Sequence, residues 1–276
     1  MQVQPSGILS SIVKHYLILE SDRNTNAGYR LFSDGNPGIV FHYKDPFKQL
    51  YHTEAIAQIQ PRSFVYGQIT HYYDLTATGS LGMVVIVLQP YSTNLLFKVA
   101  ADELNNKTID LADFYGSDIH PVEDQVYSAK TSHEIISAIE KFLLKKVSAT
   151  IPADAAFNQA ISLIYHQKGI VTIEGLLKAV PVTERQLQRK FQHYIGISPK
   201  KFAGVIKMQH FLKRLKNHAP DDKLAQIVYG SGYYDQAHLN NWFKKSAGIT
   251  PLQYHNNDNL LAINFMQMPE NSNPGS

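Results

Sequence analysis

The most constraining feature of this 276-residue chain is a segment that occurs twice in its C-terminal half, at a shift of 52 residues. The aligned positions share apolar, glycine or proline residues: Leu187 with Leu239, Phe191 with Phe243, Gly196 with Gly248, Ile197 with Ile249, Pro199 with Pro251, and Phe202 with Tyr254. Thr183 aligns with Asp235, and both residue types are good helix N-caps. This agreement predicts one helical unit that is present twice.

Each copy predicts two helices joined by a short turn. In the first copy, an apolar face at Ile173, Leu176 and Leu177 precedes a break at Val180-Pro181, and Thr183 opens the next helix. In the second copy, the packing helix carries Leu224, Ile227 and Val228, and Gly232 lies in the turn before Asp235. Such helix-turn-helix units place their second helix, the recognition helix, in the major groove of DNA.

The recognition helices carry base-reading side chains on the side opposite their apolar stripes. If Leu187 and Phe191 face inward, the outward residues of the first copy are Arg185, Gln188, Arg189 and Gln192. In the second copy they are Gln236, Ala237, Asn240 and Asn241. Arginine reads guanine, and glutamine or asparagine reads adenine, through paired hydrogen bonds.

A single long helix, residues 199–217, is expected between the two copies. As a rigid rod it holds the recognition helices about one DNA turn (~34 Å) apart, so that one chain enters two successive major grooves. Candidate phosphate contacts are Lys200, Lys201, Lys207, Lys244 and Lys245.

Charge separates the two halves of the chain. Residues 151–255 contain 14 Lys or Arg and 6 Asp or Glu, whereas the rest contains 12 basic and 17 acidic residues. The basic half therefore favours an anionic polymer as its partner. The absence of cysteine excludes disulfides, thiolate metal sites and cysteine nucleophiles, including DNA-alkyl transfer to cysteine.

The N-terminal half predicts an α+β domain. Short apolar and aromatic runs broken by turns between residues 29 and 90 predict a small β-barrel or sandwich, and helices are expected at 94–104 and 132–146. Four aromatic residues are candidates for lining a ligand cavity, or else belong to the core: Phe41, Tyr43, Tyr66 and Tyr72. His42, His52 and His71 are scattered without a His-x-His pair, so no metal site and no cofactor are expected.

The segment from Gly232 to Tyr254 resembles the C-terminal signature of AraC/XylS-type bacterial transcription regulators. A glycine-aromatic turn leads there into the recognition helix, then Phe-Lys-Lys, then Gly-x-x-Pro-x-x-Tyr, and the first copy resembles the family's other half. The resemblance covers about residues 152–256 and implies a DNA-binding domain of two helix-turn-helix motifs joined by a linker helix. It assigns base contacts to Arg185, Gln188 and Arg189, and to the four outward residues of the second copy. Family members often have Arg or Lys where this chain has Asn241.

The N-terminal half resembles, more weakly, the small cupin-like β-barrel with helices that precedes this domain in one subgroup. The resemblance implies a role in sensing a small molecule or a partner, often with dimerisation. We therefore expect an effector-sensing or dimerisation domain at 1–148, an AraC-type DNA-binding domain at 149–256 and a loosely ordered tail at 257–276.

The predicted function is sequence-specific DNA binding in transcription regulation, modulated through the N-terminal domain, and not catalysis. The alternative is a regulator without a small-molecule effector, controlled by abundance or a protein partner; a metal-dependent barrel enzyme ranks third. Expected partners are promoter DNA, with RNA polymerase, an effector and a second copy as further candidates. No secretory signal at 1–10 and no apolar run long enough for a membrane span are seen, so a cytoplasmic location is expected.

Overall fold

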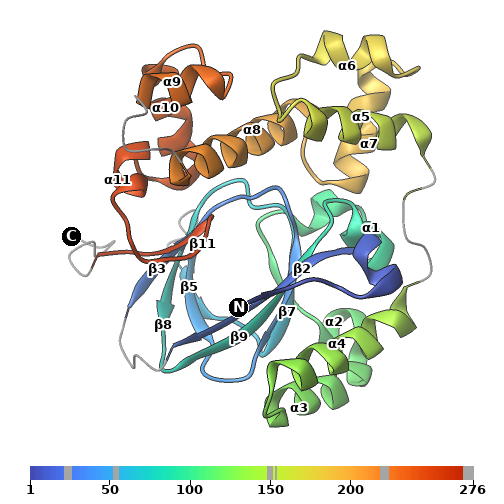
Figure 1. The fold of residues 1–276 in the computed structure, drawn as a ribbon. Coiled ribbons are helices and arrows are strands. Elements are labelled where there is room, and N and C mark those ends of the chain that lie inside the picture. Colours follow the sequence, from blue (N-terminus) through green and yellow to red (C-terminus); the bar gives the residue numbers. More distant parts are fainter. Residues whose placement is uncertain (22–26, 52–55, 148–151, 153, 218–223, 270–276) are drawn as a thin grey trace.

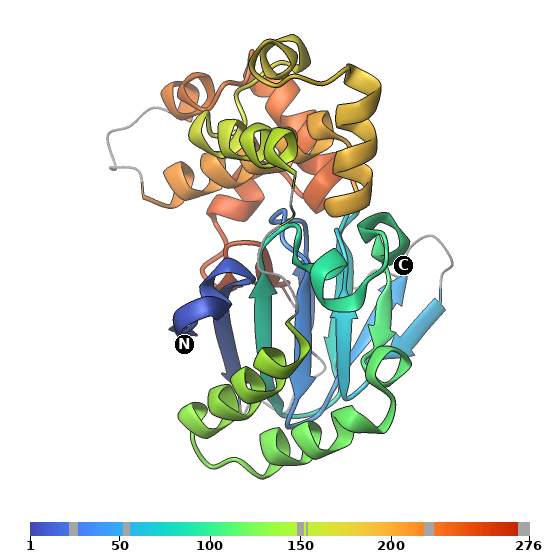
Figure 2. The same ribbon diagram turned by 90° about the vertical axis from the view of Figure 1, so that its right-hand side faces the viewer.

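The computed structural model describes residues 1–21, 27–51, 56–147, 152, 154–217 and 224–269. Figure 1 shows a β-rich unit formed by the first half of the chain and a helical unit that lies along one end of it. Figure 2, turned by 90°, shows the same two layers, with the last strands of the chain returning to the β-rich unit.

The β-rich unit contains two six-stranded antiparallel sheets. The first has the order β1-β2-β9-β4-β7-β10, with β1 at Gln2–Val3, β2 at Val13–Ser21, β9 at Leu81–Leu88, β4 at Gly38–His42, β7 at Ser63–Tyr66 and β10 at Thr108–Asp110. The second has the order β11-β12-β3-β8-β5-β6, with β11 at Leu260–Ala262, β12 at Phe265–Gln267, β3 at Gly28–Leu31, β8 at Tyr73–Ala77, β5 at Phe47–Tyr51 and β6 at Ile56–Ile59.

The β-rich domain predicted as a small barrel or sandwich is confirmed, and it consists of two separate sheets. Within the described residues no hydrogen-bonded ladder joins one sheet to the other. The first sheet ends in the two-residue strand β1 and the three-residue strand β10, and such short edges offer few groups for further pairing.

Strand β4 shows how the first sheet is buried on both faces. Ile39 and Phe41 pack in the core cluster beneath the helices, whereas Val40 packs on the opposite face with Phe47 of the second sheet. Because side chains alternate along a strand, a continuous apolar run serves two layers at once.

Helices cover the outer face of the first sheet (Figure 2). They are η1 at Gly7–Ser11, α1 at Ser92–Phe97, η2 at Ala101–Leu104, α2 at Ala112–Tyr115, η3 at Gly116–Ile119, α3 at His120–Ser128 and α4 at Ser132–Lys146. The helix predicted at 132–146 is confirmed, with Thr131 as its N-cap. The one predicted at 94–104 is two short pieces, because Lys98 ends α1 in a left-handed conformation.

The helical unit has the expected repeat. Its helices are α5 at Ala155–His166, α6 at Ile173–Ala179, α7 at Glu184–Tyr194, α8 at Pro199–Lys216, α9 at Leu224–Gly230, α10 at Gln236–Ala247 and α11 at Pro251–His255. We call α6–α7 the first motif and α9–α10 the second motif. No helix in the described ranges is long and apolar enough to cross a membrane.

The prediction that residues 257–276 are a loosely ordered tail is wrong for residues 260–267. These residues form the hairpin β11–β12, whose second strand pairs with β3. Two consecutive side chains explain this order, because Phe265 enters the core between the sheets and Met266 enters the core of the second motif. Residues 270–276, and most of the predicted domain boundary near 148, lie outside the described residues.

Candidate nucleic-acid interface

The first recognition helix, α7, begins with a complete capping box. The Thr183 hydroxyl accepts a hydrogen bond from the Gln186 backbone N–H at 3.3 Å, and Gln186 Oε1 accepts one from the Thr183 N–H at 2.9 Å. Gln186 is thereby occupied by the backbone, which leaves the following residues for other contacts.

The apolar stripe of α7 is buried as the sequence predicts. Leu187 and Phe191 are fully buried, and the Phe191 ring lies 5.4 Å from that of Phe157 on α5. The predicted base-contacting residues Arg185, Gln188, Arg189 and Gln192 are all exposed. The first motif therefore presents a polar face fixed by a packed core.

The second recognition helix, α10, repeats this design with a different cap. Asp235 Oδ1 accepts a hydrogen bond from the His238 N–H at 2.7 Å. Leu239 and Phe243 are buried, and the predicted base-contacting residues Gln236, Ala237, Asn240 and Asn241 are exposed.

Helix α8 holds the two motifs at a fixed separation because its two halves belong to different cores. Phe202 and Ile206 pack in the core of the first motif, whereas Phe211 and Leu215 pack in that of the second. A helix of this length, 18 residues, measures about 27 Å. That length suits recognition helices one DNA turn (~34 Å) apart.

Four of the five predicted phosphate-contacting lysines are exposed: Lys200, Lys201, Lys244 and Lys245. Lys207 is half-buried, and its ammonium group lies 4.5 Å from the centre of the Tyr233 ring. Burial lowers its pKa. This contact gives Lys207 a place in the packing between α8 and the second motif.

The N-terminal unit binds both motifs at the same repeated position, the glycine that follows each recognition helix. Asn105 Nδ2 donates to the Gly196 carbonyl at 2.5 Å, and Arg30 Nη1 donates to the Gly248 carbonyl at 3.3 Å. Both glycines have positive φ, at 98° and 69°. A Cβ would lie 2.5 Å from Asn105 at the first and 2.6 Å from Arg30 at the second, so a side chain at either position would displace its partner.

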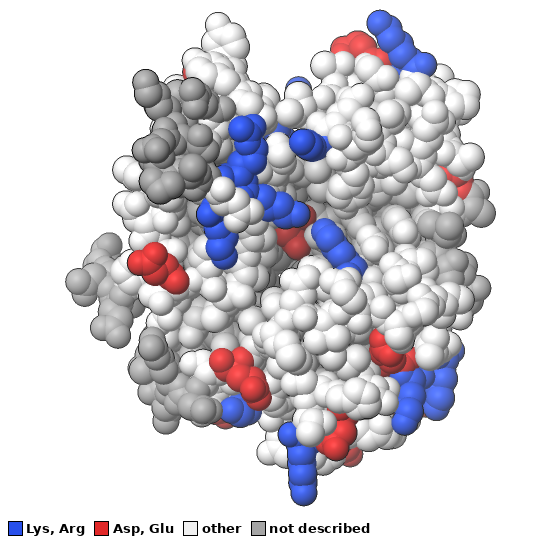
Figure 3. All heavy atoms as spheres, in the orientation of Figure 1, with Lys and Arg blue, Asp and Glu red and all other residues white. Residues whose placement is uncertain are grey.

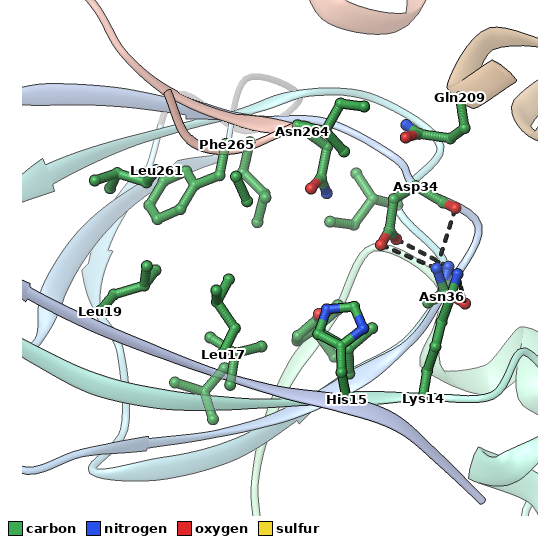
Figure 4. Close-up of a pocket in the computed structure, with 18 of the residues that line it drawn as sticks. Lys14, His15, Leu17, Leu19, Asp34, Asn36, Gln209, Leu261, Asn264 and Phe265 are labelled. Carbon is green, nitrogen blue, oxygen red and sulfur yellow. Dashed lines mark hydrogen bonds between the residues drawn. The ribbon is translucent and has the colours of Figure 1, made fainter. Parts of the chain in front are cut away.

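A cavity of about 650 Å³ lies between the two sheets and the helical unit. Its walls are mostly apolar, and they include Leu17, Leu19, Val40, Phe64 and Val85. Figure 4 shows Leu17 and Leu19 on one side and Leu261 and Phe265 on the other. The helical unit closes it through α8, which contributes Ile206, Gln209 and Lys213.

Of the four aromatic residues predicted to line a ligand cavity, Tyr66 lines this one. Phe41 does not, because strand alternation turns it toward the helices. Tyr43 packs against that same cluster, and Tyr72 stacks on Arg30, 4.1 Å from its ring centre, beside the second motif.

Basic groups surround one end of the cavity (Figures 3 and 4). They are Lys14, His15, Lys168, His210, Lys213 and Lys216, with Asp34 as a carboxylate among them. Burial lowers the pKa of Lys14, an effect that Asp34 opposes and Lys213 reinforces. Burial also lowers the pKa of His210, and the neighbouring Lys168, Arg214 and Lys213 lower it further. Four lysines and two histidines thus face a single carboxylate, Asp34, at this end of the cavity.

A buried polar chain adjoins the same cavity, which two of its members, Gln49 and Gln60, line. His42 Nε2 and Gln60 Oε1 are 3.1 Å apart, and Gln60 Nε2 donates to Gln49 Oε1 at 2.8 Å. Burial lowers the pKa of His42 to about 4, against the effect of its hydrogen bond with Gln60. Gln49 Nε2 is buried and has no hydrogen-bond partner among the described residues.

The histidines form no metal site in the described part of the chain, where no group of three potential ligands occurs. His42 belongs to the polar chain and His71 Nδ1 is 3.0 Å from the Thr70 hydroxyl. His52 lies outside the described residues.

Sequence reasoning missed the residues that join the two units, namely Arg30, Asn105 and the hairpin. Single polar residues in strands and loops carry no periodic signal. The alternation of Leu261, Phe265 and Gln267 with Leu260 and Met266 in the last strands is a weak signal of a two-sided strand.

Comparisons with known proteins agree with this geometry. Residues 176–257 match a helix-turn-helix domain family, and residues 1–110 match a domain of unknown function, DUF6597. The chain is 29% identical over 82 residues to the HTH-type transcriptional regulator MtrA of Neisseria gonorrhoeae, covering 30% of this chain and 27% of that protein. It is 28% identical over 114 residues to the uncharacterized HTH-type transcriptional regulator YisR of Bacillus subtilis strain 168, covering 40% of this chain and 39% of that protein. The matches thus span well under half of either relative.

The solved structure of ToxT from Vibrio cholerae shares the fold of most of the chain. It superimposes with a TM-score of 0.50 at 12% sequence identity, over 87% of this chain and 97% of ToxT. The fold and the repeated motif define a protein with a helix-turn-helix domain. The family match covers residues 176–257, where the sequence resembles AraC/XylS-type regulators, and both matched relatives are named HTH-type transcriptional regulators.

Proposed function

We propose that this protein is a sequence-specific transcription regulator whose two recognition helices enter successive major grooves of promoter DNA. One observation supports the proposal above the others: two capped helices expose their polar faces while α8 is packed into both of their cores. Arg185, Gln188, Arg189 and Gln192 read bases in one groove, and Gln236, Ala237, Asn240 and Asn241 read them in the next. Lys200, Lys201, Lys244 and Lys245 contact phosphates.

The proposed division is an effector-sensing or dimerisation domain at 1–148 and a DNA-binding domain at 149–256. RNA polymerase and a second copy of the chain are further proposed partners. Because the target of such a regulator is chromosomal DNA, the proposed place of action is the cytoplasm.

Selection of bound sites from random duplexes with the full-length protein tests the proposal. We expect an enriched site with two patches about one helical turn apart and an affinity that falls steeply with salt. A titration of the selected duplex at increasing salt then counts the phosphate contacts. Binding of all duplexes with equal affinity would refute sequence-specific reading.

We further propose that a small molecule in the interdomain cavity modulates DNA binding. The cavity offers an apolar interior, a cationic end at Lys14 and Lys213, and the unpartnered donor Gln49 Nε2. These features fit a molecule with an apolar body, an anionic group and a hydrogen-bond acceptor. A saturable rise in melting temperature with such a compound, lost in Lys14→Ala/Lys213→Ala, tests this role. A regulator without an effector would show no such rise with any compound of this class.

A further inference from the structure

The hairpin β11–β12 connects the cavity wall directly to the core of the second motif. It follows α11, the last helix of the DNA-binding unit, and returns across the molecule to pair with β3 (Figure 1). Phe265 faces Leu31, and Met266 faces Arg30 across this ladder. Strand β12 therefore belongs to the second sheet, between β3 and β11, although it follows the helices of the second motif in sequence.

Strand alternation places neighbouring side chains of β12 in two different environments. Phe265 lines the cavity and packs 5.6 Å, between ring centres, from Tyr29. Met266 is 2% exposed and packs in the cluster that holds Phe243 of the second recognition helix. A displacement of Phe265 thus moves Met266 as well, because the two residues share one rigid peptide.

At the end of β3, next to β12, two neighbouring side chains likewise lie in the cavity wall and in the core of the second motif. Leu31 lines the cavity, and the next residue, Phe32, is fully buried in the core of the second motif. The Phe32 N–H donates to the Asn264 carbonyl at 3.0 Å, and Asn264 Nδ2 donates to the Phe32 carbonyl at 2.9 Å. These reciprocal bonds fasten the turn of the hairpin to β3.

The hairpin is also bonded to the DNA-binding unit from which it emerges. The Tyr254 hydroxyl of α11 donates to the Ile263 carbonyl in the hairpin turn at 2.8 Å. The Tyr254 ring lies 5.9 Å from that of Phe243, between centres. A continuous packed path therefore runs from the cavity through the hairpin to the recognition helix α10.

Among the described residues, no strand follows the first motif and returns to the sheets as the β11–β12 hairpin does after the second. After α7 the chain continues into α8, and the motif meets the N-terminal unit through Gly196 and through Asn94, whose Nδ2 lies 3.3 Å from His193 Nε2. The cavity touches the core of the first motif directly at Ile206, whereas it reaches the core of the second motif through the hairpin.

We propose that the β11–β12 hairpin is a coupling strap that transmits occupancy of the cavity to the second helix-turn-helix motif. A ligand packed against Leu261 and Phe265 holds β12 on β3, and Met266 then stabilises α10. The stability of α10 then sets the affinity of the second motif for its half-site. The effect of the strap on DNA binding rests on the proposed function, whereas the link that it makes between the cavity and α10 does not depend on DNA.

Hydrogen exchange in the full-length protein tests the strap without DNA. The probe is 1-anilinonaphthalene-8-sulfonate, an apolar anion that suits both the walls and the cationic end of the cavity. In the wild type, we expect a saturating probe to slow amide exchange in residues 236–247 at least threefold, and more than in residues 184–194. No probe-dependent slowing in residues 236–247 would overturn the proposal.

Variants then identify the path. Met266→Ala is expected to abolish the probe-dependent slowing in α10 while the Kd of the probe stays within about threefold, because Met266 does not line the cavity. Met266→Leu is expected to restore the slowing, and Gln267→Ala, a neighbouring change on the same strand, is expected to retain it. Full slowing in Met266→Ala would contradict the strap.

A second variant keeps the test valid if Met266→Ala unfolds α10 by itself. Tyr254→Phe removes one hydrogen bond to the hairpin but leaves the ring in the core. We expect it to reduce the probe-dependent slowing at least twofold with little change in probe-free exchange; unchanged slowing would count against the strap.

The duplex selected for the proposed function gives the reciprocal measurement. Since coupling between two binding sites is reciprocal, this duplex is expected to change the Kd of the probe by the factor by which the probe changes the Kd of the duplex. Met266→Ala is expected to bring both factors close to one. If no duplex is ever selected, the proposed function fails while the exchange result stands.

Discussion

The two helix-turn-helix motifs have the same core but different faces. Leu187 and Phe191 in the first motif correspond to Leu239 and Phe243 in the second, and all four are buried. The exposed face of α7 carries two arginines, whereas that of α10 carries amides and Ala237. The two copies therefore share the buried residues that fold the motif and differ in the exposed residues that are proposed to contact DNA.

Their attachments to the N-terminal unit differ in the same way. Each motif offers the carbonyl of its terminal glycine, but Asn105 binds one and Arg30 binds the other. Arg30 is also paired with Asp74, with both side chains about nine-tenths buried. The second motif, whose exposed face carries fewer charges, is thus held to the N-terminal unit by Arg30 and by the hairpin.

The largest predicted effects come from replacing the equivalent buried phenylalanine in each of the two cores. Phe191→Ala and Phe243→Ala are each expected to cost about 3–5 kcal/mol of local stability, because each leaves a large buried void. Phe243 shares its core with Phe32, whereas Phe191 packs with residues of the helical unit. Phe243→Ala is therefore expected to increase exchange around Phe32 as well, and hydrogen exchange with urea unfolding measures both.

A matched control for these changes is Leu252→Ala on α11, since Leu252 is 60% exposed. We expect it to stay within about 0.5 kcal/mol of the wild type. Equal loss of protection around Phe32 in both phenylalanine variants would show that the motifs are coupled alike to the N-terminal unit.

The next largest difference concerns the two DNA faces. Arg189→Ala is expected to cost about 1–3 kcal/mol on the selected duplex and to relax base preference in its groove, because arginine reads guanine through two hydrogen bonds. Asn240→Ala is expected to cost a similar amount in the other groove only if an adenine lies there. Competition binding on duplexes mutated in one patch at a time measures both.

Equal losses on all duplexes would instead make Arg189 a phosphate contact. Glu184→Ala is a useful control, because it removes an exposed side chain of the first turn of α7 outside the predicted reading set.

The sequence predicts the helical unit well because its folding signals are local and repeated. Thr183, Asp235 and Thr250 each cap a helix as their residue types indicate, and the apolar stripes at spacings of three and four are buried. The linker helix expected at 199–217 extends from Pro199 to Lys216.

The sequence predicts the β-rich unit and the contacts between units much less well, because those depend on distant pairings. Phe41 and Val40 are adjacent and both apolar, and only the sheet decides that Val40 lines the cavity. The hairpin lies next to amide-rich segments that resemble a loose tail, and its order comes from β3, more than 200 residues earlier in the chain. Arg30 and Asn105 bind glycines that lie 218 and 91 residues later in the chain.

Helices α5 and α10 both begin with an aspartate N-cap, Asp154 in α5 and Asp235 in α10. The Asp154 carboxylate accepts a hydrogen bond from the Phe157 N–H at 3.0 Å and another from Lys190 of α7. Burial raises the pKa of Asp154, but the bonds from Lys190 and Phe157 outweigh this and lower it below its ordinary value. The stabilisation is therefore present above pH ~4 and is lost as the pH falls through the folded-state pKa.

Asp154→Asn is expected to cost about 1 kcal/mol at neutral pH and to flatten the acid side of the stability curve of the first motif. Asp235→Asn, whose cap has no lysine partner among the described residues, is expected to cost less, because asparagine caps a helix nearly as well as aspartate. Urea unfolding between pH 3 and 7, followed by exchange in α7 and α10 separately, measures the two curves. An unchanged acid slope in Asp154→Asn would remove the carboxylate from the stabilisation of the first motif.

The smallest predicted effects concern the exposed lysines, and they complete the comparison of the two motifs. Lys200 and Lys201 begin α8 after the first motif, whereas Lys244 and Lys245 lie in the last turn of α10. Each lysine that contacts a phosphate contributes about one unit to the slope of log affinity against log salt. Lys200→Gln/Lys201→Gln and Lys244→Gln/Lys245→Gln are each expected to lower that slope by about two without changing base preference. The face of α10 has no arginine. Loss of Lys244 and Lys245 is therefore expected to weaken half-site binding by the second motif more than loss of Lys200 and Lys201 weakens half-site binding by the first motif. Equal weakening would mean that the phosphate contacts, unlike the base-reading faces, are shared evenly between the two motifs.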